Sequence, residues 1–190
     1  CGPVAVANSL WWLDSRYERV PIPPPTINDH FPLVQSYIDG VDDHDSRNVP
    51  PFIEDLAWYM DTDGRRTGIR HFGTYVFDMQ TGIDAYLESK GLSDKFYEKT
   101  VWGKSLTFDL IERELYLCED VVLLLGFWQY DERTGLWTRF GGHYVTAVGV
   151  DSKDFYIAIS DPFVNNAEDG GMGRVLPLEH PYPHCCRVHN

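Results

Sequence analysis

The spacing of apolar residues changes once along this chain, and that change limits the folds open to it. Up to about residue 118 the apolar side chains recur at helical spacing, as Val4, Ala7 and Trp11 do. From Val121 onward, short apolar runs bounded by turn residues are typical of strands. Because the helices come first and the hairpin-forming strands second, the sequence predicts an α+β domain rather than a doubly wound α/β one.

Four helices are predicted before residue 119, over residues 2–16, just after Pro50-Pro51, over 76–90 and over 107–118. Turn residues mark several of their ends: Pro3 suits a first turn, and Gly91 suits the left-handed position after a helix. Asp61-Thr-Asp-Gly64 resembles half of a calcium loop but lacks ligands at the remaining positions, so it predicts a turn that ends the second helix.

The strands are predicted as a hairpin, 121–131 and 136–140, followed by strands 143–150 and 155–160 joined by the turn 151–154. The run from Val121 to Trp128 is too short to cross a membrane and indicates a buried strand, with Leu124 in the core. We expect one domain over 1–190, with 1–118 mainly helical and 119–190 mainly β.

Composition excludes some partners. A net charge of -13 argues against nucleic acid, which needs clustered basic residues, and against an anionic membrane surface. The 14% aromatic content indicates an ordered domain and, with the acidity, favours an extracellular or secreted protein. We expect no membrane insertion, and the sequence makes no prediction of oligomeric state. The chain starts at a Cys without Met or a signal peptide, which indicates processing or trimming.

Neither a metal nor another cofactor is predicted. The four cysteines lack a CxxC motif, and the spacing in residues 184–189 does not suit zinc. A disulfide between Cys118 and either Cys185 or Cys186 stays open. The acidic stretch Asp42-Asp43-His44-Asp45 has the residues to bind a cation, but a solvated loop is the expectation.

Three residues suggest nucleophilic catalysis. Cys1 precedes a helix, and a helix N-terminus beside a protonated histidine lowers a thiol pKa from its usual value near ~8.5. His143 begins one predicted strand, and Asp161 ends the next. If these strands pair about the turn at 151–154, imidazole and carboxylate meet, which is the arrangement of a base oriented by a third group. Each residue alone has an ordinary structural explanation; their conjunction favours catalysis.

The segments CGPVAVAN, GGHYVTAVGVD and ISDPF, in this order, resemble the papain-like cysteine peptidases, and within them the branch of bacteriocin-processing, double-glycine leader peptidases. The resemblance covers most of the chain except the loops between about Arg16 and Pro51. It implies a helical lobe led by the nucleophile helix, packed on a twisted antiparallel sheet. It also implies that Cys1 is the nucleophile, His143 the general base and acid, and Asp161 the group that orients the histidine.

One departure from the family pattern concerns the group that binds the oxyanion, the negative charge that develops on the substrate oxygen during the reaction. The family usually places a glutamine a few residues before the cysteine, and Gln35, Gln80 and Gln129 do not match that position. Trimming, maturation by cleavage before Cys1, or degeneration would each account for this. If Cys1 is a true N-terminus, its own amine is an alternative base, although His143–Asp161 would then have no role.

The sequence therefore predicts a cysteine peptidase that acts on a peptide or protein substrate through a Cys1–His143–Asp161 triad and a thioester. A transglutaminase-like or other acyl-transfer enzyme with the same triad is one alternative. A catalytically silent papain-like binding domain is the other.

Overall fold

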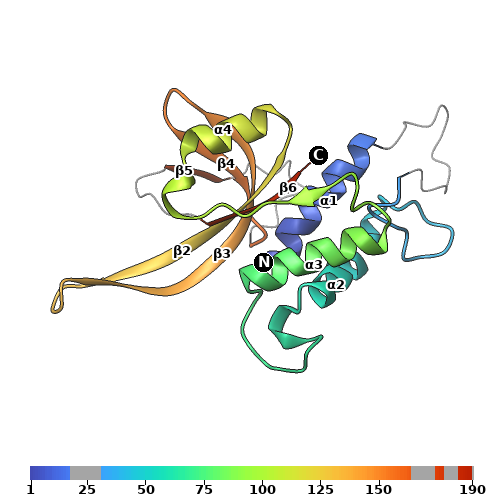
Figure 1. The fold of residues 1–190 in the computed structure, drawn as a ribbon, viewed down its shortest axis with the longest axis horizontal. Helices are drawn as coiled ribbons and strands as arrows, with labels where there is room; N and C mark the ends of the chain where they lie inside the picture. Colours follow the sequence, from blue (N-terminus) through green and yellow to red (C-terminus); the bar gives the residue numbers. More distant parts are fainter. Residues whose placement is uncertain (18–30, 164–173, 178–183, 190) are drawn as a thin grey trace. The chain divides into compact units, whose positions relative to one another are not determined.

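The computed structural model describes residues 1–17, 31–163, 174–177 and 184–189 (Figure 1). The chain divides into two compact units. One is helical and spans Gly2–Glu98; the other contains Cys1 together with Lys99–Asn190 and carries the large antiparallel strands. Helices and antiparallel strands are thus both present, which confirms the predicted α+β class.

The helical unit contains α1 (Gly2–Tyr17), α2 (Val49–Tyr59), α3 (Val76–Ser89), the short strand β1 (Tyr97–Glu98), and two 3-10 turns, η1 (Ser46–Asn48) and η2 (Thr62–Gly64). Helix α2 packs against both α1 and α3. The predicted helix ends lie close to the observed ones because proline and glycine mark them, Gly91 having the expected positive φ of 67°. The turn predicted at Asp61–Gly64 is confirmed as η2.

The core of the helical unit is made of side chains with almost no exposure: Leu10, Leu13, Leu33, Phe52, Leu56, Met60, Met79, Ile83, Tyr86 and Leu87. Helices α2 and α3 approach closely at Gly82. A Cβ at this position would lie 2.7 Å from the Met60 Cα and 2.8 Å from the Met60 backbone N. Only glycine fits there, since any side chain would force the helices apart.

The sheet unit contains η3 (Gly103–Ser105), α4 (Phe108–Tyr116) and strands β2 (Asp120–Asp131), β3 (Leu136–Asp151), β4 (Tyr156–Ser160), β5 (Arg174–Pro177) and β6 (His184–His189). Within this unit the strands lie in the order β6-β2-β3-β4-β5, and every neighbouring pair is antiparallel. Helix α4 packs on β2 and β3, so this predicted helix groups with the strands rather than with the other helices.

The core of the sheet unit lies beneath α4. Ile111 from this helix packs with Val121 and Leu123 of β2, Val145 of β3 and Ile159 of β4. The first half of β2 is buried, Leu124 included, which confirms the predicted core strand. Its second half extends away from the other strands with the facing part of β3 (Figure 1), and its side chains are largely exposed.

Strand β3 corrects a prediction. Residues 136–140 and 143–150 were expected as two strands divided at Gly141-Gly142, but they form one continuous strand. The pairing with β2 changes register at this point: Phe127 pairs with Gly141, whereas the next residue, Trp128, pairs with Arg139. A local bulge therefore absorbs the irregularity without ending the strand.

One further expectation is corrected, and one open question about Cys118 is answered. Asp43 lies within the stretch expected to be solvated, yet it is only 3% exposed. Cys118 does not form a disulfide, and it lies beyond the end of α4 with a positive φ of 59°. None of the helices in the described part of the chain is both long enough and apolar enough to span a membrane.

Candidate functional site

His143 and Asp161 form a close pair in the sheet unit. The His143 Nε2 and the Asp161 Oδ1 are 2.6 Å apart, and the two residues are separated by 18 positions in the sequence. The side chains are 18% and 9% exposed, so the pair is largely shielded but retains access to solvent. An ionised carboxylate can only accept hydrogen bonds. Nε2 of His143 is therefore the nitrogen that carries the hydrogen, and Nδ1 is the basic nitrogen.

The register of β3 and β4 explains this contact. Thr146 pairs with Ser160, so the antiparallel pairing extended by one step sets Asp161 opposite Val145. His143 lies two residues before Val145 and, by strand alternation, on the same face of the sheet. The two side chains are therefore diagonal neighbours, which long side chains can bridge. The predicted pairing of these strands about the turn at 151–154 is confirmed.

Asp161 is held by the turn that follows β4. Its Oδ1 also accepts a hydrogen bond from the Phe163 backbone N at 2.9 Å. One carboxylate oxygen thus receives both the imidazole and a backbone N–H. This fixes the orientation of the carboxylate and, through it, the plane of the His143 ring.

Gly142 leaves space beside His143. A Cβ at this position would lie 2.5 Å from the Nη2 of Arg139, which is on the same strand. It would lie 3.2 Å from the carbonyl oxygen of Leu125, which is on the neighbouring strand β2. Leu125 is also the residue that pairs with His143. Glycine at 142 therefore lets the arginine and the neighbouring backbone come close to the strand, as the Gly-Gly-His sequence predicts.

Cys1 immediately precedes α1, and its residue is exposed. It forms no disulfide, and it belongs to the same compact unit as His143 and Asp161. Helix α1 has 16 residues, and its first N–H groups lack intrahelical partners, which favours negative charge at this end. A thiol here lies where a thiolate is stabilised.

The next residue explains the Cys-Gly part of the motif. A Cβ on Gly2 would lie 2.9 Å from the Thr74 Oγ1 and 3.1 Å from the Met79 Cε. The Thr74 hydroxyl is in turn 2.6 Å from that of Thr62. The segment before α3 therefore packs directly on Gly2 and fixes the first turn of α1.

Two of the three glutamines have side-chain partners in the helical unit. Gln35 Oε1 accepts a hydrogen bond from Lys90 Nζ at 2.5 Å, and Gln80 Nε2 donates to Glu98 Oε1 at 3.3 Å, both within the helical unit. Gln129 lies in the outer half of β2. The sequence also offers Asn165, Asn166, Glu168 and Asp169, in a Gly-rich loop after Asp161, as a lip of a substrate cleft or as an ordinary surface loop. These residues lie outside the described part of the chain, as do the side chains of Cys185 and Cys186.

Comparison with models of known protein families finds no match to this chain. A search of curated proteins likewise finds no significant relative.

A second group of chemistry-bearing side chains lies in the helical unit, at the acidic stretch for which a solvated loop was expected. Asp14, Asp43 and His44 each offer a ligand atom, and these atoms lie within 4.8 Å of one another. Asp14 is on α1, whereas Asp43 and His44 are neighbours in the loop before η1. The histidine beside two acidic residues was the one signal in the sequence; the partnership with Asp14 requires the fold.

Proposed function

We propose that this chain is a thiol hydrolase, a papain-like cysteine peptidase that acts on a peptide or protein substrate. The observation that carries the proposal is the 2.6 Å contact between His143 Nε2 and Asp161 Oδ1. An imidazole fixed in this way presents one basic nitrogen, which a nucleophilic thiol requires. The position of Cys1 before α1 supports the proposal, because the helix end stabilises a thiolate.

In the first half of the reaction His143 Nδ1 takes the proton of the Cys1 thiol. The thiolate then attacks the carbonyl carbon of the scissile peptide bond and forms the carbon–sulfur bond. His143 returns that proton to the nitrogen of the leaving amine as the carbon–nitrogen bond breaks. Asp161 stays ionised throughout and stabilises the imidazolium that forms between these steps.

In the second half a water molecule attacks the thioester carbon. His143 accepts one proton from the water, and the carbon–sulfur bond breaks to give the acid and the Cys1 thiolate. The negative charge that develops on the substrate oxygen in both halves needs hydrogen-bond donors. The Cys1 backbone N–H, at the start of α1, is the donor that we assign to this role.

The test is hydrolysis of a mixed peptide library by the full chain, with products identified by mass spectrometry. Cleavage should disappear in Cys1→Ser, while Cys118→Ser should cleave as the wild type does. Cys118 is a fair control because it too is an exposed thiol outside any disulfide. Hydrolysis that survives in Cys1→Ser would contradict the proposal.

The same assay separates the alternatives. If the thioester of Cys1 is resolved by an added amine rather than by water, the chain is an acyl-transfer enzyme. If no peptide is cleaved and Cys1 forms no thioester with an activated ester, the chain is a binding domain.

A further inference from the structure

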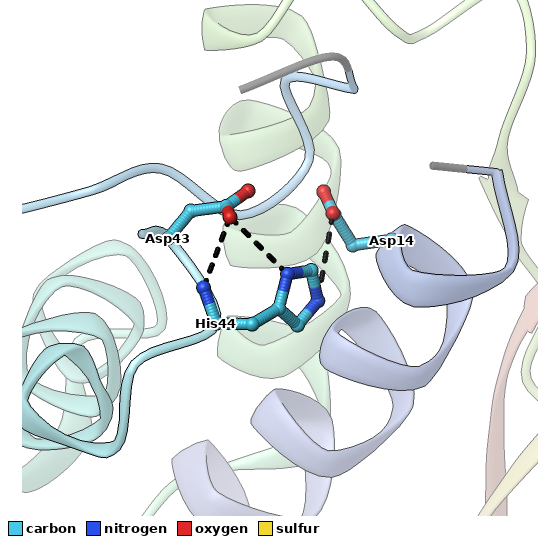
Figure 2. Close-up of side chains that lie close together, drawn as sticks. All are labelled: Asp14, Asp43 and His44. Atoms are coloured by element: carbon cyan, nitrogen blue, oxygen red, sulfur yellow. Dashed lines mark hydrogen bonds and ion pairs between the residues drawn. The ribbon is translucent and has the colours of Figure 1, made fainter. Parts of the chain in front are cut away.

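We propose that Asp14, Asp43 and His44 form a binding site for a divalent first-row transition cation, of which Zn²⁺ fits the ligands best. Figure 2 shows the His44 ring between the two carboxylates. Its Nδ1 is 3.2 Å from Asp43 Oδ1, and its Nε2 is 3.7 Å from Asp14 Oδ1. The site lies within the helical unit and is independent of the proposed peptidase.

Burial makes this cluster unusual. The side chains of Asp14 and Asp43 are 0% and 2% exposed, and that of His44 is 18% exposed. Two buried carboxylates bring two negative charges, and buried charges are normally paired or bound to a metal. A divalent cation bound between Asp14 and Asp43 would neutralise both carboxylates at once.

Asp43 gives a second, independent indication. Its Oδ1 accepts from the His44 backbone N at 3.0 Å and faces the imidazole, but its Oδ2 is buried without a hydrogen-bond partner among the described residues. An unsatisfied carboxylate oxygen in a protein interior costs free energy. A cation bound to Asp43 would remove that cost.

The surrounding contacts hold the three side chains in place. Asp14 Oδ2 accepts from the Val34 backbone N at 2.6 Å, and Ser15 Oγ lies 2.8 Å from His44 Nε2. Asn48 donates to the carbonyl oxygens of Asp42 and Asp43 at 2.7 Å and 3.1 Å, which pins the loop. A site built on contacts of this kind is preorganised, so little ordering is needed when the cation binds.

The donor set selects the class of cation. Calcium and magnesium take oxygen ligands, whereas imidazole suits zinc and its first-row neighbours. Zinc binds nitrogen and oxygen at about 2.0–2.2 Å, so two ligands of one ion are at most about 4.4 Å apart. The three ligand atoms lie within 4.8 Å of one another, which is close to that value. Side-chain movements of a few tenths of an ångström would bring all three within reach of one ion.

The experiment uses the full chain with its accessible thiols blocked by iodoacetamide, titrated with Co²⁺ as a spectroscopic probe. We expect saturation at one equivalent, no thiolate-to-cobalt charge-transfer band, and displacement by Zn²⁺. Zinc at 100 times its Kd should raise the Tm by about 5–10 °C. Absence of saturable binding, or a thiolate band, would overturn the proposal.

Variants locate the site. Asp43→Asn and His44→Gln should each weaken cobalt binding at least about tenfold, since loss of even a group that only orients a ligand costs about that much. Asp45→Asn removes the same charge from the same loop but leaves the three ligands in place, and it should bind as the wild type does. His143→Gln, which alters the other histidine–carboxylate pair, should also bind normally. Unchanged affinity in both Asp43→Asn and His44→Gln would contradict the assignment.

A measurement on the wild-type protein covers the case in which the ligand variants do not fold. Zinc should protect His44 from modification by diethyl pyrocarbonate, as mapped by mass spectrometry. His143 should be modified equally with and without zinc, because it is not one of the three proposed ligands. Equal modification of His44 in both conditions would overturn the proposal.

Discussion

The His143 imidazole and the Asp161 carboxylate meet as diagonal neighbours on β3 and at the end of β4, at a distance of 2.6 Å. In the proposed mechanism Asp161 acts through the histidine, and its essential property is an oxygen that accepts a hydrogen bond from Nε2. A residue that retains an acceptor should therefore retain part of the function.

We expect Asp161→Ala to lower kcat/KM for peptide hydrolysis by about 10²–10⁴. Asp161→Asn should lose less, because its amide oxygen can still accept from Nε2. The matched control is Asp154→Ala, an exposed carboxylate in the turn between the same two strands. Equal losses in Asp161→Ala and Asp161→Asn would show that the acceptor oxygen is not what Asp161 contributes.

The core beneath α4 gives a prediction on stability. Leu123 is 2% exposed and packs in the core cluster of the sheet unit. We expect Leu123→Ala to lower the free energy of unfolding by about 2–5 kcal/mol, as measured by urea denaturation. Leu136→Ala, at a position 64% exposed on β3, should change it by less than about 0.5 kcal/mol. A similarly small effect at Leu123 would mean that this cluster is not a stabilising core.

The contact between α2 and α3 gives a second stability prediction. Gly82→Ala places a methyl group 2.7 Å from the Met60 Cα, a backbone atom that cannot rotate away. We expect a loss of about 1–3 kcal/mol, even though alanine favours helix formation. Glu88→Ala, exposed on the same helix, is the control. A stabilised Gly82→Ala protein would show that the helices separate without cost.

A buried and a half-buried tyrosine, Tyr86 and Tyr37, predict sensitivity to alkali. Tyr86 donates from its hydroxyl to the Leu33 carbonyl at 2.6 Å, and burial raises its pKa well above the ordinary value. Burial, followed by the hydrogen bond to Asp55, likewise raises the pKa of Tyr37. In the unfolded chain both phenols lose their protons near pH ~10, whereas the folded protein keeps them. The unfolded state then binds fewer protons, so stability falls as the pH rises above that value.

The measurement is the free energy of unfolding in urea between about pH 9.5 and 11. Tyr86→Phe should make the decline shallower by up to about 1.4 kcal/mol per pH unit. Tyr116→Phe, at a position 75% exposed, should leave the slope as it is in the wild type. If Tyr86→Phe leaves the slope unchanged, the phenol of Tyr86 does not lose its proton more easily in the unfolded chain than in the folded protein.

Much of the fold could be predicted from the sequence because its elements are locally marked. Pro3, Pro50 and Gly91 mark helix ends by backbone properties that hold in any context. The meeting of His143 and Asp161 could also be predicted, since the turn at 151–154 sets the pairing of two strands and the pairing sets the distance.

Other features depend on partners that are distant in sequence. The acidic stretch at 42–45 has the composition of a solvated loop, but Asn48 donates to the Asp43 carbonyl oxygen, and Asp43 is buried close to Asp14. Gly141-Gly142 has the composition of a strand break, but it continues β3, since both glycines pair with residues of β2. Strand β5, a short strand with little alternation, gave no recognisable pattern.

The central claim is that Cys1 is a thiolate nucleophile activated by His143, and the rate at which Cys1 is alkylated tests it most directly. Iodoacetamide labelling of Cys1 and Cys118 can be followed in one sample by mass spectrometry, which makes Cys118 an internal reference. At pH 6–7 we expect Cys1 to react about tenfold or more faster than Cys118 in the wild type, and this advantage should fall sharply in His143→Ala. Equal rates at the two cysteines, unchanged by His143→Ala, would contradict the account.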